Sequence, residues 1–111
     1  MSDDDLRMAK FALDGAFQVR NGGRTQSFTI SVVTFAHDET ANILRLGLAL
    51  RARGASTSTP LTVELPPEVV LVDRPVNWGR FIRTQLRDWI RAGKLAAGHR
   101  VLQIPRPPRQ S

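Results

Sequence analysis

The sequence predicts an α+β fold, in which helices pack on one face of a small sheet. Residues 28–33 place Phe28, Ile30 and Val32 at every second position, which is the period of a strand with one buried face. Residues 77–93 instead repeat apolar side chains at the period of an α-helix. An Asn-Gly pair at 21–22 separates two β-prone runs, which is typical of a hairpin turn.

The first third of the chain is predicted to form a β-hairpin. Its strands run along about 10–20 and 24–35, on either side of the turn at Asn21 to Gly23. Residues 1–9 are polar and acidic and are predicted to be a disordered N-terminus. Four phenylalanines lie on the predicted strands, and we expect most of them in the core rather than on a surface that stacks nucleic-acid bases; they are Phe11, Phe17, Phe28 and Phe35.

A helix is predicted to follow the hairpin over about 39–53. Asp38 can cap such a helix, and Glu39 suits the positive end of the helix dipole. Ile43, Leu46 and Leu50 share one helical face, and Gly54 supplies a stop.

The second half is predicted to alternate between strands and a helix. Residues 61–65 alternate as a short strand, and 66–75 are ambiguous between a strand and a short helix that starts at the Pro-Pro pair. A second helix is predicted over about 77–93 and a last strand over 99–104. The single domain therefore spans 10–104, and the Pro/Arg-rich residues 105–111 are predicted to be a flexible tail.

Charge is distributed unevenly along the chain. The formal net charge is +6, but residues 74–111 carry nine basic side chains and one acidic side chain, whereas residues 1–73 carry seven basic and nine acidic side chains. An excess of +8 in one third of the chain favours a polyanionic partner.

The predicted helix at 77–93 separates its charges from its apolar residues. On a helical wheel, five cations fall within an arc about 80° wide, while Trp78, Ile82 and Trp89 fall on the opposite side. Like charges four residues apart repel each other, so an unmixed row of cations favours an anionic partner over a simple solvated face. We therefore predict phosphate contacts through the helix and the segments after it, from Arg80, Arg83, Arg87, Arg91, Lys94, Arg100, Arg106 and Arg109.

Part of the sequence resembles the ribbon-helix-helix family of DNA-binding proteins, especially its antitoxin-like members. The resemblance covers "LTVELPPEVV" and "VNWGRFIRTQLRDWI", with Leu65-Pro66-Pro67, Asn77-Trp78 and Ile82-Arg83 in the family's positions. It implies an intertwined homodimer whose strand at 61–65 enters the major groove of DNA. Either Thr62 and Glu64 or Leu61 and Val63 would then face the bases.

The sequence contains no pattern typical of an enzyme or of a cofactor site. It has no Cys, so disulfides and thiolate metal sites are excluded. His37 and His99 lack the spacing of metal ligands, and no Gly-rich phosphate loop precedes a helix. We therefore predict no catalytic activity, no cofactor and no bound metal.

The N-terminal residues and the lengths of the apolar runs indicate where in the cell the protein is expected. The acidic N-terminus is unlike a secretory signal, and no apolar run approaches the roughly 20 residues that span a bilayer. A cytoplasmic protein that does not bind membranes is predicted. Its predicted function is nucleic-acid binding as a homodimer, with DNA preferred over RNA and a role in regulating transcription as one interpretation. The alternatives are a protein-interaction module whose basic helix docks on an acidic partner protein, and a plain oligomerisation domain.

Overall fold

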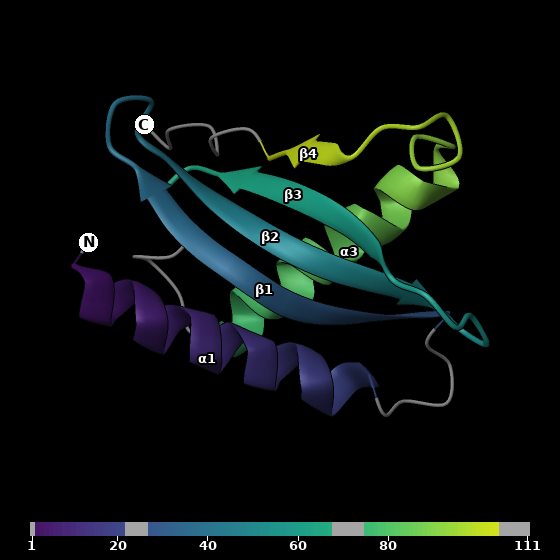
Figure 1. Cartoon of the computed structure of the whole chain (residues 1–111), viewed down its shortest axis with the longest axis horizontal. Coiled ribbons are helices and arrows are strands. Elements are labelled where there is room, and N and C mark those ends of the chain that lie inside the picture. Colours follow the sequence, from purple (N-terminus) through teal and green to yellow (C-terminus); the bar gives the residue numbers. More distant parts are fainter. Residues whose placement is uncertain (1, 22–26, 68–74, 105–111) are drawn as a thin grey trace, which may run out of the picture.

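A computed structural model describes residues 2–21, 27–67 and 75–104. Within these ranges the chain forms an α+β domain with two helices and a four-stranded mixed sheet (Figure 1). The elements in chain order are α1 (Asp3–Asn21), β1 (Phe28–Asp38), β2 (Ile43–Ala52), β3 (Thr59–Leu65), α3 (Pro75–Arg91) and β4 (Val101–Gln103).

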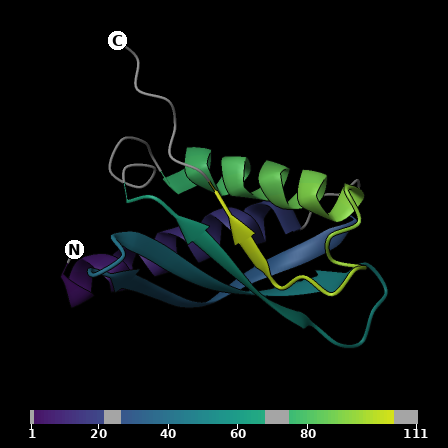
Figure 2. The same cartoon turned by 90° about the horizontal axis from the view of Figure 1, so that it is seen from above.

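The strands lie in the order β1-β2-β3-β4. β1, β2 and β3 form an antiparallel meander, with a register irregularity in β1 between Val32 and Thr34. β4 is parallel to β3, because α3 carries the chain back across the sheet before β4 begins. Both helices lie on the same face of the sheet, and no helix among the described residues covers the other face, which we call the open face (Figure 2).

The core lies between this helical layer and the inner face of the sheet. β2 contributes every second residue to it, and these residues pair with inner-face residues of β1, as in Ile30 with Leu50 and Val32 with Leu48. The helices contribute Leu13, Phe17, Trp78, Ile82 and Leu86, each at most 3% exposed. Fully burying an aliphatic or aromatic side chain of this size stabilises a fold by about 1.5–3 kcal/mol.

A glycine permits the close crossing of the two helices. A Cβ at Gly79 of α3 would lie 3.3 Å from both Ala16 Cβ and Leu13 Cδ1 of α1. Such contacts are tighter than ordinary van der Waals packing, so the helices can approach this closely only where α3 has no side chain.

The predicted N-terminal hairpin is wrong, because residues 3–21 form α1. The buried residues Leu13 and Phe17 and the half-buried Leu6 and Ala9 recur every three or four positions, which is the helical period. Ser2 and Asp5 close the N-terminus as a capping box: Asp5 N donates to Ser2 Oγ at 3.2 Å, and Ser2 N donates to Asp5 Oδ2 at 3.4 Å. Residues 3–9, expected to be disordered, are the first turns of this helix.

The helix predicted at 39–53 is also wrong, because residues 43–52 form β2. Leu44, Leu46, Leu48 and Leu50 are buried at every second position, with Arg45, Gly47, Ala49 and Arg51 between them, which is the strand period. Asp38 does act as a cap, but of the turn between β1 and β2, where its Oδ1 accepts a hydrogen bond from Ala41 N at 3.1 Å. Asn42 completes that turn with a φ of 51°.

The elements of the second half lie where the sequence placed them. The predicted strand at 61–65 is within β3, the helix at 77–93 corresponds to α3, and the strand at 99–104 contains β4. Residues 68–74 of the ambiguous segment 66–75 lie outside the described residues, and so does the tail 105–111. In the ranges that the structure describes, no helix is both long and apolar enough to cross a membrane.

Candidate nucleic-acid interface

Packing against the sheet fixes which side of α3 meets solvent. Trp78 is 3% exposed, and its ring meets that of Phe35 on β1 edge to face, with centroids 6.2 Å apart. Ile82 and Leu86 follow at intervals of four residues and are fully buried. The opposite side of the helix therefore faces away from the sheet.

Three arginines lie on the exposed side of α3, and we call them the α3 ridge: Arg80, Arg87 and Arg91. They follow each other at seven and four residues, which is about 10 and 6 Å along a helix axis. Their side chains are long enough to reach a ligand laid along the helix, so the ridge presents a row of cations.

Lys94 stands just beyond the end of α3. Gly93 adopts a φ of 82° and its N donates to Ile90 O at 3.0 Å, while Lys94 N points to Trp89 O at 3.4 Å. These two bonds are the pattern of a Schellman cap, which fixes how the chain leaves the helix. Lys94 is exposed at this end and adds a fourth cation beside the ridge.

The carboxylates that the structure describes do little to neutralise the ridge. Arg87 Nε lies 4.0 Å from Asp88 Oδ1, and their side chains are 50% and 63% exposed, so this ion pair contributes little. Among the described residues, no carboxylate oxygen lies within salt-bridge distance of Arg80, Arg91 or Lys94. The positive potential of the ridge therefore remains available to a ligand.

Arg83 does not belong to the ridge, contrary to the sequence prediction. It is 7% exposed, its guanidinium carbon lies 5.2 Å from the centroid of the Phe28 ring, and Nη1 donates to Phe28 O at 3.3 Å. Its neighbours along the same row of the helix, Gly79 and Leu86, are both buried. Because Gly79 and Leu86 carry no charge, this row of the helix was the signal in the sequence that Arg83 packs inward, here against the start of β1.

Arg100 lies on the segment between α3 and β4 rather than on α3 itself. Its Nη1 donates to Leu95 O at 3.2 Å and to His99 O at 2.9 Å, which ties it to the turn before β4. It also lines a hollow of about 420 Å³ on the open face of the sheet, together with Gly47 and Thr62. Arg106 and Arg109 lie outside the described residues, so the structure unites Arg80, Arg87, Arg91 and Lys94 from the predicted set.

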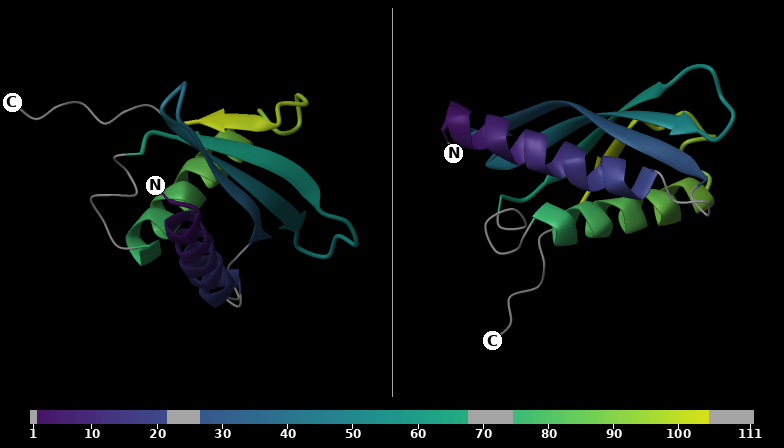
Figure 3. Two further views of the ribbon diagram at one scale, coloured as in Figure 1. Left: turned by 60° about the vertical axis from the view of Figure 1, so that its left-hand side comes forward. Right: turned by 90° about the horizontal axis from the view of Figure 1, so that it is seen from below.

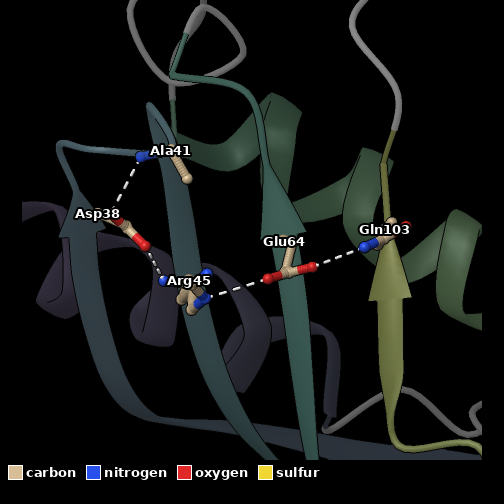
Figure 4. Close-up of polar contacts among 5 residues, drawn as sticks. All are labelled: Asp38, Ala41, Arg45, Glu64 and Gln103. Atoms are coloured by element: carbon tan, nitrogen blue, oxygen red, sulfur yellow. Dashed lines mark hydrogen bonds and ion pairs between the residues drawn. The ribbon is translucent and has the colours of Figure 1, made fainter.

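A polar network that the sequence did not predict crosses the open face of the sheet (Figure 4). Arg45 on β2 donates to Asp38 Oδ2 on β1 at 2.5 Å and to Glu64 Oε2 on β3 at 3.0 Å. Glu64 Oε1 accepts from Gln103 Nε2 on β4 at 2.9 Å, so the network joins all four strands. Hydrogen bonding to Arg45 lowers the pKa of Asp38, and the bonds to Asp38 and Glu64 raise the pKa of Arg45. The network fixes the strands to each other.

Strand β3 lies between β2 and β4 in the sheet. It pairs with β2 along Thr59–Leu65 and with β4 at Thr62–Glu64. Leu61 and Val63 are buried in the core, and Glu64 is held by Arg45 and Gln103.

The described residues contain no group of three or more His, Asp or Glu side chains arranged to hold a metal ion.

Comparisons with models of protein families, with curated protein sequences and with solved structures found no match to this chain.

Proposed function

We propose that this protein binds nucleic acid, DNA in preference to RNA, by laying the α3 ridge against backbone phosphates. The observation that carries the proposal is the row of Arg80, Arg87 and Arg91, exposed on one side of α3 with Lys94 at its end. Arginine suits this role because its guanidinium group donates two parallel hydrogen bonds to phosphate oxygens.

The packing of α3 supports the proposal, because Trp78, Ile82 and Leu86 anchor the helix and so keep the backbone positions of its cations at a constant spacing. A helix that is already ordered loses less conformational entropy on binding. Contacts to phosphates do not distinguish bases, so the expected binding depends weakly on sequence. A role in regulating transcription would require base contacts from other parts of the chain.

Four phosphate contacts set the expected salt dependence. Each contact releases counterions from duplex DNA, and the logarithm of the association constant falls with the logarithm of salt concentration with a slope of about −0.9 per contact. A slope of about −3.6 corresponds to a loss of roughly a hundredfold in affinity between about 50 and 200 mM salt.

The test is a titration of labelled duplex DNA, single-stranded DNA and RNA with the full chain, followed by fluorescence anisotropy. A triple variant, R80Q/R87Q/R91Q, removes the ridge. The matched control, R7Q/R51Q/R53Q, changes net charge by the same amount at three exposed arginines off the ridge. The proposal expects the ridge variant to lose most of its affinity and the control to keep most of it.

Two results would count against the proposal. Equal losses in the two triple variants would show that only net charge matters. The other is an absence of nucleic-acid binding, combined with ridge-dependent binding to an acidic polypeptide such as polyglutamate. That outcome would assign the ridge to an acidic protein partner instead.

A further inference from the structure

Helix α1 has a second apolar face that its own domain does not cover. Phe11 is 83% exposed, Val19 82% and Met8 72%, and Ala12 and Gly15 beside them are exposed too. We call these five residues the α1 stripe. They fall within an arc of about 100° on the side of the helix opposite to the buried Leu13 and Phe17. In Figure 3, α1 lies at the outside of the molecule over β1.

The α1 stripe differs from an ordinary solvated helix face. No charged residue between 8 and 19 falls within its arc, although the flanks of the helix carry Arg7, Lys10 and Asp14. Scattered exposed apolar residues are normal on a protein surface, but a contiguous apolar row along three turns of one helix marks an interaction site.

Gly15, at the centre of the stripe, adds an independent observation. A Cβ built on Gly15 would have no atom within 4 Å, so nothing in this chain's own packing requires a glycine there. Glycine in the middle of a helix weakens it relative to alanine. A glycine at this place is explained when another backbone or a large side chain approaches the helix closely from outside.

We infer that the occupant of the α1 stripe is the α1 stripe of a second copy, packed antiparallel. The first turn of α1 carries Asp3, Asp4 and Asp5. An antiparallel pair places the three aspartates of each copy at opposite ends of the helix pair and opposes the two helix dipoles. A parallel pair would place six aspartates together.

The spacing of the stripe fits the same arrangement. With the two-fold axis near residue 13, Phe11 of one copy lies opposite Gly15 of the second copy, and Met8 lies opposite Val19 of the second copy. The largest side chain of the stripe therefore meets the position without a side chain, which allows knobs-into-holes packing between the helices.

The size of the stripe predicts a weak dimer. Large apolar side chains bury on the order of 150 Å² each, so two stripes together bury roughly 1,000 Å², near the lower limit for a stable interface. Association should therefore depend on concentration. This inference concerns a surface on α1 and does not rest on the proposed binding of nucleic acid by α3.

The first test measures molar mass by light scattering or sedimentation equilibrium, from about 5 to 500 µM, a range suited to an interface of this size. The full chain should rise from its monomer mass of 12.3 kDa towards twice that mass. F11E should remain a monomer throughout. The control is V33E, which makes the same change at an exposed apolar position on β1, off the stripe, and should associate like the parent. Circular dichroism establishes that both variants are folded.

A second test fixes the orientation, because the chain contains no cysteine of its own. M8C and V19C proteins are oxidised separately and as a mixture. An antiparallel pair gives the mixed disulfide far faster than either homodimer, whereas a parallel pair gives homodimers. Three results would each overturn the inference. The parent chain could stay monomeric across the whole concentration range, V33E could dissociate as fully as F11E, or homodimers could dominate the oxidised mixture.

Discussion

The guanidinium group of Arg83 lies over the ring of Phe28 and donates to the carbonyl oxygen of the same residue. The carbon-to-centroid distance is 5.2 Å, and the hydrogen bond to the carbonyl measures 3.3 Å. A single side chain of α3 therefore engages both the ring and the backbone of the residue that begins β1. A cation held this way is a structural element, and it is separated from the exposed arginines one turn away on the same helix.

We expect Arg83→Ala to destabilise the fold by about 1–3 kcal/mol, because it removes a charged hydrogen bond to a buried carbonyl and the packing of the arginine stem. Arg83→Met should cost less, since methionine keeps most of that packing. Urea denaturation followed by circular dichroism measures both values. Arg80→Ala is the control at an exposed position of the same helix and should change stability by less than about 0.5 kcal/mol. Equal effects at the two positions would contradict the anchoring role of Arg83.

Helix α3 could be predicted from the sequence because its two faces are chemically distinct. Trp78 and Ile82 fall on one side and Arg80 and Arg87 on the other, and no β-strand pattern fits that spacing. Arg83 was misplaced because a helical wheel gives the direction of a side chain but does not show what packs there. The position of α1 beside α3 depends on tertiary contacts, such as that of Gly79 with Leu13.

The first two elements of the chain could not be assigned correctly from the same kind of reasoning. In residues 43–52, leucines at 44, 46, 48 and 50 obey the strand period, but Ile43, Leu46 and Leu50 alone also fit a helix. In residues 3–21, exposed Phe11 and Val19 mix with buried Leu13 and Phe17, which obscures the helical period. An apolar residue that faces solvent in the monomer misleads any prediction that assumes it is buried.

Gly79→Ala should destabilise the protein by about 1 kcal/mol, although alanine is the better helix former. The new Cβ would lie 3.3 Å from Ala16 Cβ, an atom attached to the backbone of α1 that no side-chain rotation can move. The close contact can therefore be relieved only if α1 and α3 move apart. Denaturant midpoints measure the change, and a larger residue such as valine should cost more. A stabilised alanine variant would show that the helices can separate freely.

The network around Arg45 predicts that the stability of the fold decreases at acidic pH. The pKa of Asp38 is held below its ordinary value, chiefly because of the hydrogen bond from Arg45. A carboxyl with a depressed pKa in the folded state stabilises the fold above its unfolded pKa, and this contribution disappears as pH falls through the folded value. The melting temperature of the parent should therefore exceed that of Asp38→Asn near neutral pH. The two melting temperatures should converge as pH falls through the folded pKa of Asp38. A difference in melting temperature between the parent and Asp38→Asn that stays constant with pH would contradict a stabilising ion pair between Asp38 and Arg45.

Single substitutions on the α3 ridge should change the salt dependence of DNA binding by a defined amount. Arg87→Gln should reduce the magnitude of the slope of log affinity against log salt by about 0.9, because one phosphate contact is lost. Arg51→Gln, at an exposed position of β2 away from α3, should leave the slope unchanged. Anisotropy titrations at four or more salt concentrations give these slopes. Identical slopes for parent and Arg87→Gln would exclude Arg87 from the contact.

Gly15→Ala should separate the stability of the monomer from its association. A Cβ at this position meets no atom of the same chain, so alanine should stabilise the isolated chain by up to about 1 kcal/mol through its helix propensity. The same methyl group would hold a second helix away and should weaken the dimer. Thermal melting at low micromolar concentration measures the first effect, and sedimentation equilibrium at high concentration measures the second. A variant that is more stable as a monomer and associates less is expected. Stronger association than the parent would mean that no close approach at Gly15 occurs.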